Sequence, residues 1–354
     1  MPPTAAHSSL LARCRYRAIL ALCALAVCIA ASLAGCSEAV IAPRTSAALP
    51  VLQLPAPLAA YTIFVTDLST GDVAELGKHT YHIGRSVHGL GLSSDGRTLY
   101  VTDISANRLA GYALHGAALD FTNGAPVGSQ PVHMVNTRDG KTIFVTDFSG
   151  SAITVLDAAN WATRATVGVP AGPHGIVLSP DGRWAYVACS GGAAIAVLDT
   201  ASTTLAATIA LPTGAQPYGI ATSRDGRYIY ASDNFTGRLF VIDAATRAVL
   251  PPIQVGLRPA LIARSPDGAT LYVANGGAHS VSVLDLARDP AQPTLRRNVP
   301  VDGYPHGLAV TPDGRYVVVA NTIGRSLSVL DATSDRVVAT IPAEKYPNDV
   351  LIVP

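Results

Sequence analysis

An Asp-Gly dipeptide recurs through the chain at a nearly constant spacing of 42 to 46 residues. The six copies begin at Asp95, Asp139, Asp181, Asp225, Asp267 and Asp313. Each copy lies between two short segments rich in β-branched and aromatic residues, which is the pattern of a hairpin turn between strands. A repeat of this length cannot bury its own apolar face and must pack against its neighbours. The period predicts an all-β protein built as a β-propeller, with one blade per repeat.

One repeat, from Pro173 to Leu211, shows how a blade is built. Its predicted strands are His174–Ser179, Trp184–Cys189, Ala194–Asp199 and Leu205–Ala210. The first two are joined by the turn Pro180-Asp-Gly-Arg183, and Gly191-Gly192 turns the chain toward the third. Four antiparallel strands are the content of a propeller blade.

The ends of the chain decide the number of blades. Inner strands are expected to start at His88, His133, His174, Tyr218, Ala260, His306 and Asn348. Second strands are expected to end at Asp67, Asp103, Asp147, Cys189, Asp233, Asn275 and Asn321. Segment 61–67 has no inner strand before it, and segment 347–354 has no partner after it. We therefore expect residues 61–354 to form a seven-bladed β-propeller of four-stranded antiparallel blades, closed by pairing of the N- and C-terminal strands.

The N-terminus has the pattern of an export signal. Arg13, Arg15 and Arg17 precede an apolar stretch at 18–32, which is shorter than the roughly 20 residues of a membrane span. The following Leu33-Ala-Gly-Cys36 resembles the bacterial lipobox, which implies cleavage before Cys36 and its lipidation with acyl chains such as palmitate. This predicts a lipoprotein signal peptide at 1–35, a lipidated Cys and flexible tether at 36–60, and a place in the bacterial cell envelope. Ser37 after the lipidated Cys favours sorting to the outer membrane, with residues 61–354 facing the periplasm or exposed at the cell surface. The alternative to cleavage before Cys36 is that the N-terminal segment stays in place as an uncleaved anchor.

Charge and cysteine content argue against nucleic-acid binding and against a disulfide within the body. Charged residues make up 14% of the chain, and its 25 basic residues include the three N-terminal arginines. Without these three, 22 basic residues face 24 acidic ones, so no basic surplus is left for nucleic-acid binding. Only Cys189 lies beyond residue 36, which excludes a disulfide within the body.

The recurring Pro-His-Gly, Ser-Pro-Asp-Gly-Arg and Tyr-Val-Ala-Asn segments resemble the YVTN-repeat family of propellers, with Val-Leu-Asp in the third strand. The resemblance covers residues 61–354. It implies an extracytoplasmic binding or scaffold module. Related seven-bladed proteins include lactonases and streptogramin lyases, but no catalytic signature of theirs is recognised in this chain.

Candidate site residues lie where inner strands start and second strands end, because both are expected at the mouth of the central channel. The candidate metal ligands are His88, His133, His174, His306, Asp103, Asp147 and Cys189, and the candidate ligand-binding residues are Tyr218, Asp233 and Asp67. Imidazole, carboxylate and thiolate groups together suit a zinc, copper or nickel ion. The alternative is structural: the histidines shape turns, and the Asp and Asn side chains accept bonds from the amides that follow.

These observations favour a lipid-anchored propeller, held at the membrane through Cys36, that binds a small ligand or a partner protein without catalysis. Two alternatives use the same channel mouth. One is a transition-metal-binding protein with a His/Asp cluster, and the other is an enzyme of the lactonase or lyase kind. The sequence contains no phosphate-binding loop, H-E-x-x-H or G-x-S-x-G motif, and it leaves the question of catalysis open.

Overall fold

The computed structural model describes residues 44–45, 56–115, 118–343 and 345–354. The predicted signal peptide, Cys36 and most of the predicted tether lie outside these residues, so lipidation and the boundaries at 35 and 60 stay predictions. Within the described residues, no helix has both the length and the apolar content needed to cross a membrane.

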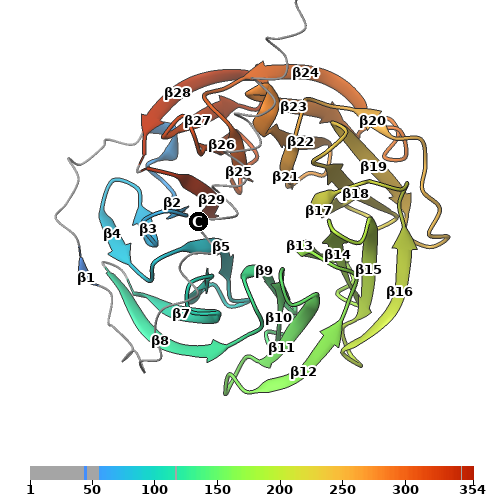
Figure 1. Cartoon of the computed structure of the whole chain (residues 1–354). Coiled ribbons are helices and arrows are strands. Elements are labelled where there is room, and N and C mark those ends of the chain that lie inside the picture. Colours follow the sequence, from blue (N-terminus) through green and yellow to red (C-terminus); the bar gives the residue numbers. More distant parts are fainter. Residues whose placement is uncertain (1–43, 46–55, 116–117, 344) are drawn as a thin grey trace, which may run out of the picture. The chain divides into compact units, whose positions relative to one another are not determined.

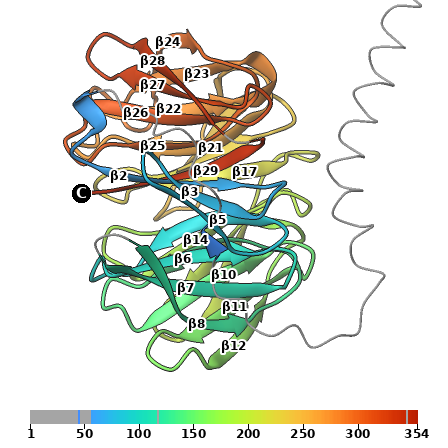
Figure 2. The same cartoon turned by 90° about the vertical axis from the view of Figure 1, so that its left-hand side faces the viewer.

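Seven β-sheets are arranged in a ring in the part of the chain that the structure describes (Figure 1). Each is a blade of four antiparallel strands, and the closing blade carries a fifth, β1 (Arg44–Thr45), at its outer edge. Helical structure in the described ranges is confined to two short 3-10 turns, η1 (Ala56–Leu58) and η2 (Gly276–Ala278). The predicted fold class is confirmed. Figure 2 shows the same ring from the side.

The four strand positions recur in every blade. The inner strands are β5 (Val87–Leu92), β9 (Pro131–Asn136), β13 (Pro173–Leu178), β17 (Pro217–Thr222), β21 (Pro259–Arg264), β25 (Pro305–Val310) and β29 (Pro347–Val353). The second strands are β2 (Thr62–Asp67), β6 (Thr98–Asp103), β10 (Thr142–Asp147), β14 (Trp184–Cys189), β18 (Tyr228–Asp233), β22 (Thr270–Asn275) and β26 (Tyr316–Asn321). The third strands are β3 (Asp72–Glu75), β7 (Arg108–His115), β11 (Ala152–Asp157), β15 (Ala194–Asp199), β19 (Arg238–Asp243), β23 (Ser280–Asp285) and β27 (Ser326–Asp331). The outer strands are β4 (His79–His82), β8 (Ala118–Pro126), β12 (Thr163–Gly168), β16 (Thr204–Ala210), β20 (Ile253–Gln254), β24 (Thr294–Pro300) and β28 (Arg336–Pro342).

The C-terminal strand β29 closes the ring by pairing with β2, near the C-terminus marked in Figure 1. Val350 lies opposite Val65 in this pairing, and Ile352 opposite Ile63. Val350 belongs to the same apolar cluster as Ile63 of its own blade and Val318 of the preceding blade. The inner edge of β2 is therefore paired, as the sequence predicted.

The Asp-Gly turns form because three local features agree. In β13–β14, the Ser179 hydroxyl accepts the amide of Trp184 at 2.9 Å, and Asp181 accepts the amide of Arg183 at 3.0 Å. Gly182 has φ of 75°, in the left-handed region that favours glycine. The other five Asp-Gly glycines also have positive φ. This turn chemistry fixes the end of each inner strand and the register of the next.

Apolar contacts and one strong ion pair join the blades. Ile195 and Val197 of one blade pack with Ile229 and Phe240 of the next, and six further clusters repeat this arrangement among the described residues. Residues 287–297, which we call the insertion, lengthen the connection between β23 and β24. Arg296 of the insertion pairs with Asp335 of the following blade, Nε to Oδ2 at 2.6 Å and Nη2 to Oδ1 at 2.8 Å.

A candidate site at the channel mouth

The start of each inner strand is irregular, and this irregularity brings side chains to the channel. In blade β13–β16, Pro173 pairs with Cys189, and the register then shifts before Ile176. His174 and Gly175 lie within the shifted segment. The same shift follows the first inner-strand residue in all seven described blades. A bulge interrupts the alternation of side chains between the two faces of a strand. The residues after the opening Pro or Val can therefore point toward the axis of the ring.

Six side chains meet there, and we call them the hub cluster: His88, His133, His174, His306, Tyr218 and Asp349. The ring centroid of His88 lies 5.0 Å from that of His133, 5.3 Å from that of His174 and 5.7 Å from that of His306. These rings come from four different blades, so their contact places them at the centre of the ring. The four predicted histidines are therefore brought together.

Tyr218 and His306 form one side of the hub cluster. The Tyr218 ring stacks on His174 with a centroid distance of 3.5 Å, and its hydroxyl lies 3.1 Å from Nε2 of His306. The other ring nitrogen of His306, Nδ1, lies 3.2 Å from the carbonyl oxygen of Asn348. Both nitrogens of His306 thus have partners, and Tyr218 is held against His174.

Asp349 is a site residue that the sequence analysis missed. Its Oδ2 accepts the amide of Leu90 at 3.0 Å and lies 3.9 Å from Nδ1 of His133. The strand registers align His88 with His174, Tyr218, His306 and Asn348, each directly after the first inner-strand residue.

His133 follows its opening Pro131 by two residues. The prediction that aligned it with the other histidines was therefore wrong by one residue. In this register, His133 and Asp349 take the place of a glycine present in blades such as those of Gly175 and Gly307. This replacement of a repeated glycine was the signal that could have identified Asp349.

Burial keeps the hub imidazoles neutral. It lowers the pKa of His133 to about 3 and that of His306 to about 4, and it holds the pKa values of His88 and His174 well below their usual range. Charge repulsion from neighbouring histidines adds to this effect at His88, His133 and His174. Burial also raises the pKa of Asp349 to about 6. At neutral pH the cluster consequently offers imidazole lone pairs rather than positive charges.

Three ring nitrogens of the cluster have no hydrogen-bond partner among the described residues. They are Nδ1 of His88, Nε2 of His133 and Nδ1 of His174. His88 and His174 are 6% and 2% exposed, so solvent does little to compensate. A buried polar atom without a partner costs about 1–3 kcal/mol, and such atoms point to a missing ligand, ion or water.

The carboxylates at the ends of the second strands do not join the cluster. Asp67 accepts the amides of Ser69 at 2.8 Å and Thr70 at 2.9 Å. Asp103 accepts the amide of Ala106 at 3.1 Å and pairs with Arg108 at 3.0 Å.

Asp233 accepts the amides of Gln216 at 2.9 Å and Phe235 at 3.2 Å. Each second-strand end pairs with the opening Pro or Val of its blade rather than with the residue after it. The side chains of Asp67, Asp103 and Asp233 accept bonds from neighbouring turns. These contacts are the Asx-type turns of the structural alternative.

Two further predicted ligands also lie apart from the histidines. Oδ2 of Asp147 accepts the hydroxyl of Thr154 at 2.6 Å, and burial raises the pKa of Asp147 to about 6. Cys189 is fully buried among apolar side chains such as Phe144 and Ile153. Burial raises the pKa of its thiol to about 12, which disfavours the thiolate that binds metals. Of the predicted ligands, the structure brings His88, His133 and His174 within ligand-sharing distance of one another, and metal binding stays a prediction.

Buried threonines position the hub residues through hydrogen bonds to their backbone. The Thr146 hydroxyl accepts the amide of His133 at 3.0 Å and donates to the carbonyl of His174 at 2.9 Å, so it bridges two blades. Thr66 makes the equivalent bridge between the amide of Asp349 and the carbonyl of His88. Ala188, at the same position of its own blade, makes no such bridge. The bridge is therefore not common to all hub blades, because the blade of His306 also has an alanine, Ala320, at this position.

Replacing Thr146 by Val keeps the shape of the side chain and removes the bridge. The amide of His133 and the carbonyl of His174 would lose this buried partner, and we expect the free energy of unfolding to fall by about 2–4 kcal/mol. Urea denaturation measures this loss. Thr166→Val, an exposed site on β12, is the control and should change stability by less than about 0.5 kcal/mol. Equal effects of the two substitutions would contradict the positioning role.

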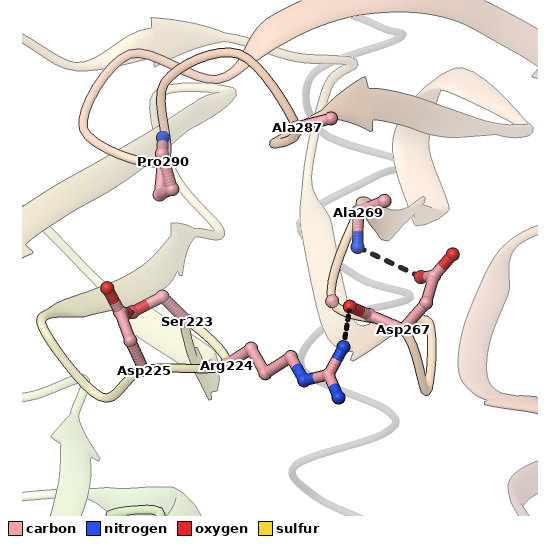
Figure 3. Close-up of a pocket in the computed structure, with 8 residues that line it drawn as sticks. Ser223, Arg224, Asp225, Asp267, Ala269, Ala287 and Pro290 are labelled. Carbon is pink, nitrogen blue, oxygen red and sulfur yellow. Dashed lines mark hydrogen bonds between the residues drawn. The ribbon is translucent and has the colours of Figure 1, made fainter.

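A pocket on the opposite face contains none of these residues (Figure 3). It lies at the Asp-Gly turns of Asp225 and Asp267, beside Ala287 and Pro290 of the insertion. There Nη1 of Arg224 donates to the carbonyl of Asp267 at 2.8 Å. Inner strands start at the hub cluster and end at these turns, so the pocket and the candidate site are at opposite ends of the strands.

Comparison with solved structures shows the same architecture in several proteins. The chain aligns with the periplasmic gluconolactonase of Pseudomonas aeruginosa at 20% identity and a TM-score of 0.70, over 83% of this chain and 99% of that one. A candidate 6-phosphogluconolactonase of Bacteroides fragilis aligns at 17% identity and a TM-score of 0.72, over 85% and 100% of the two chains. Hydrazine synthase of Kuenenia stuttgartiensis aligns at 21% identity and a TM-score of 0.67, over 75% and 95%.

At these identities the structural likeness establishes the fold alone. No curated protein matches the chain by sequence. A family model does match it, the model described as lactonase, 7-bladed beta-propeller, over residues 60–336. This span includes most of the ring and all hub-cluster residues except Asp349. The chain therefore belongs to the lactonase family of seven-bladed β-propellers.

Proposed function

We propose that the protein hydrolyses a lactone at the hub cluster. The observation that carries the proposal is the convergence of three buried, unpartnered imidazole nitrogens beside a buried carboxyl in a propeller of the lactonase family. The likeness to a periplasmic gluconolactonase supports the same reaction class. The sequence alone favoured a non-catalytic binding or scaffold module, and these findings support the lactonase alternative better.

Lactone hydrolysis adds water to the ring carbonyl, breaks the bond to the ring oxygen and yields a hydroxy acid. The reaction needs a group that removes a proton from water and a donor for the negative oxygen that forms on the carbonyl. Neutral imidazoles such as His133 and His174 can activate water, directly or through a bound ion. Asn348 is 2% exposed, and its Nδ2 has no partner in the described structure. It is the amide donor that we assign to the carbonyl oxygen.

The rim of the mouth indicates which lactones fit. Phe235 and Ile323 follow the ends of second strands, and Leu257 and Tyr346 precede inner strands, so all four lie on the hub face. They are 67%, 54%, 63% and 39% exposed, respectively. The exposed Arg85, Arg325 and Lys345 lie in turns of the same kind, so this face offers apolar contacts together with positive charge, and charged and uncharged lactones are both candidates. The predicted lipid anchor at Cys36 would place this activity in the bacterial cell envelope.

The test is acid release by the purified full-length protein, followed in a pH-stat with δ-gluconolactone, 6-phosphogluconolactone and γ-nonalactone. We expect at least one lactone to be hydrolysed with saturation kinetics. Replacing His174 by Gln should lower kcat/KM by about 100-fold or more, because a water-activating group contributes about 10²–10⁴. His82→Gln, on the exposed outer strand β4, is the control and should leave the rate unchanged. Absence of turnover on all three lactones, or full activity of the His174 variant, would contradict the proposal.

A further inference from the structure

We propose that the hub cluster binds a divalent transition-metal ion, zinc in the first place, through one ring nitrogen each of His88, His133 and His174. These three residues can present ring nitrogens that all lie within 4.8 Å of one another. The site stands on its own geometry; only the role of the ion in lactone hydrolysis rests on the proposed function.

The free nitrogens define the ligand set. Nδ1 of His88, Nε2 of His133 and Nδ1 of His174 lack hydrogen-bond partners among the described residues. Four-coordinate zinc holds nitrogens at about 2.0–2.1 Å, which separates any two by about 3.4 Å. The ring nitrogens, which lie at most 4.8 Å apart, would have to approach one another to reach this spacing.

Neighbouring groups orient the ligands as in known metal sites. Histidine ligands commonly face a carboxylate or a carbonyl with their second ring nitrogen. Nδ1 of His133 faces Oδ2 of Asp349 at 3.9 Å while its Nε2 stays free. Tyr218 stacks on His174 and is itself held by His306. Asp349, Tyr218 and His306 are thus positioning residues rather than ligands.

Three protein ligands leave a fourth position on the ion. Catalytic zinc sites keep such a position for water, whereas structural sites fill all four with protein ligands. A bound water would lose its proton to solvent at near-neutral pH, and the resulting hydroxide would add to the lactone carbonyl. The ring oxygen then leaves with a proton from solvent, so one water is consumed for each hydroxy acid formed.

The experiment measures metal directly, without substrate. Full-length protein in detergent is stripped with chelator, dialysed against zinc and examined by elemental analysis and isothermal titration calorimetry. We expect one zinc per chain with Kd below about 1 μM, and a cobalt-substituted form with the visible absorption of a four-coordinate ion. His133→Gln and His174→Gln should each weaken binding by at least 100-fold. Asp349→Asn should weaken it by about 10–100-fold, the range typical of groups that orient metal ligands. His82→Gln should bind as the original protein does.

Circular dichroism confirms that each variant is folded. A folded protein that takes up no zinc, copper or nickel in stoichiometric amount would overturn the proposal, and so would undiminished binding by a folded His133→Gln/His174→Gln double variant. Lactone turnover by the metal-free protein at the rate of the zinc-loaded protein would overturn the role of the ion in hydrolysis while leaving the lactonase proposal in place. Stoichiometric zinc binding without turnover of any lactone would support the metal site and contradict the lactonase proposal.

Discussion

Deletion of residues 347–354 is expected to abolish cooperative folding. These residues contain β29, the inner strand of the closing blade, which pairs with β2 along its length. The deletion exposes the edge of β2 and removes Val350 from its apolar cluster. It also removes Asp349, whose backbone amide bonds to Thr66. Since domains are typically stable by about 5–15 kcal/mol, loss of a whole core strand should exceed what the ring can tolerate. Thermal melting followed by circular dichroism and limited proteolysis measure the effect.

A rearranged chain supplies the control. Residues 347–354, followed by a copy of the Ser-Pro-Asp-Gly-Arg turn, are inserted between residues 60 and 61 of the deleted protein. The closing blade would then be continuous in sequence, like the other six described blades, and cooperative melting should return. A deletion variant that melts at the original temperature would show that β29 does not complete the ring.

Acidification of the metal-free protein is expected to lower its stability by about 3 kcal/mol per pH unit between pH 6 and pH 5. Burial keeps His88, His133, His174 and His306 neutral in the folded state, with the pKa of His133 lowered to about 3. The unfolded chain protonates the same groups below pH 6.5, so it binds more protons and gains stability as pH falls.

Two buried carboxyls oppose this trend. The pKa values of Asp349 and Asp147 are raised to about 6, so between pH 4 and pH 6 the folded state holds protons there that the unfolded state has released. The unfolded state binds nearly four more protons on the histidines, and the folded state binds nearly two more on the carboxyls. The unfolded state therefore holds a net excess of about two protons, which gives the expected slope.

Urea unfolding in chelator at pH 5, 6 and 7 measures the slope. His174→Gln removes one of the four groups and should reduce the slope by about half. The exposed control His82→Gln should change it little. Stability that is independent of pH across this interval would mean that the hub histidines titrate alike in both states, contrary to their burial.

The fold could be predicted from the sequence because its determinants are local and repeated. The predicted segments Trp184–Cys189 and Ala194–Asp199 coincide with β14 and β15 as observed. Their alternating apolar residues set the strand period, and the Asp-Gly turn before them sets where the hairpin bends. The half-blades at 61–67 and 347–354 were enough to predict seven blades and the closure by β29.

The candidate site was predicted only in part. His88, His174 and His306 start inner strands in a repeated motif, so their place at the channel followed from the repeat. Cys189 was assigned to the same place, but its thiol lies in an apolar cluster. A strand end can direct its side chain to the channel or to the neighbouring turn, and the residue type alone does not decide which.

The sequence by itself thus determined the strands, the turns, the number of blades and the histidines available to the channel, because each depends on residues close together in the chain. The tertiary structure decided which side chains meet. A bulge at the start of each inner strand selects the residues that face the axis, and it places His133 one residue beyond the predicted alignment. Asp349 comes within 3.9 Å of His133 because the last strand closes the ring. Contacts across the channel depend on this closure and on the bulge geometry, neither of which is written in the local pattern of any one repeat.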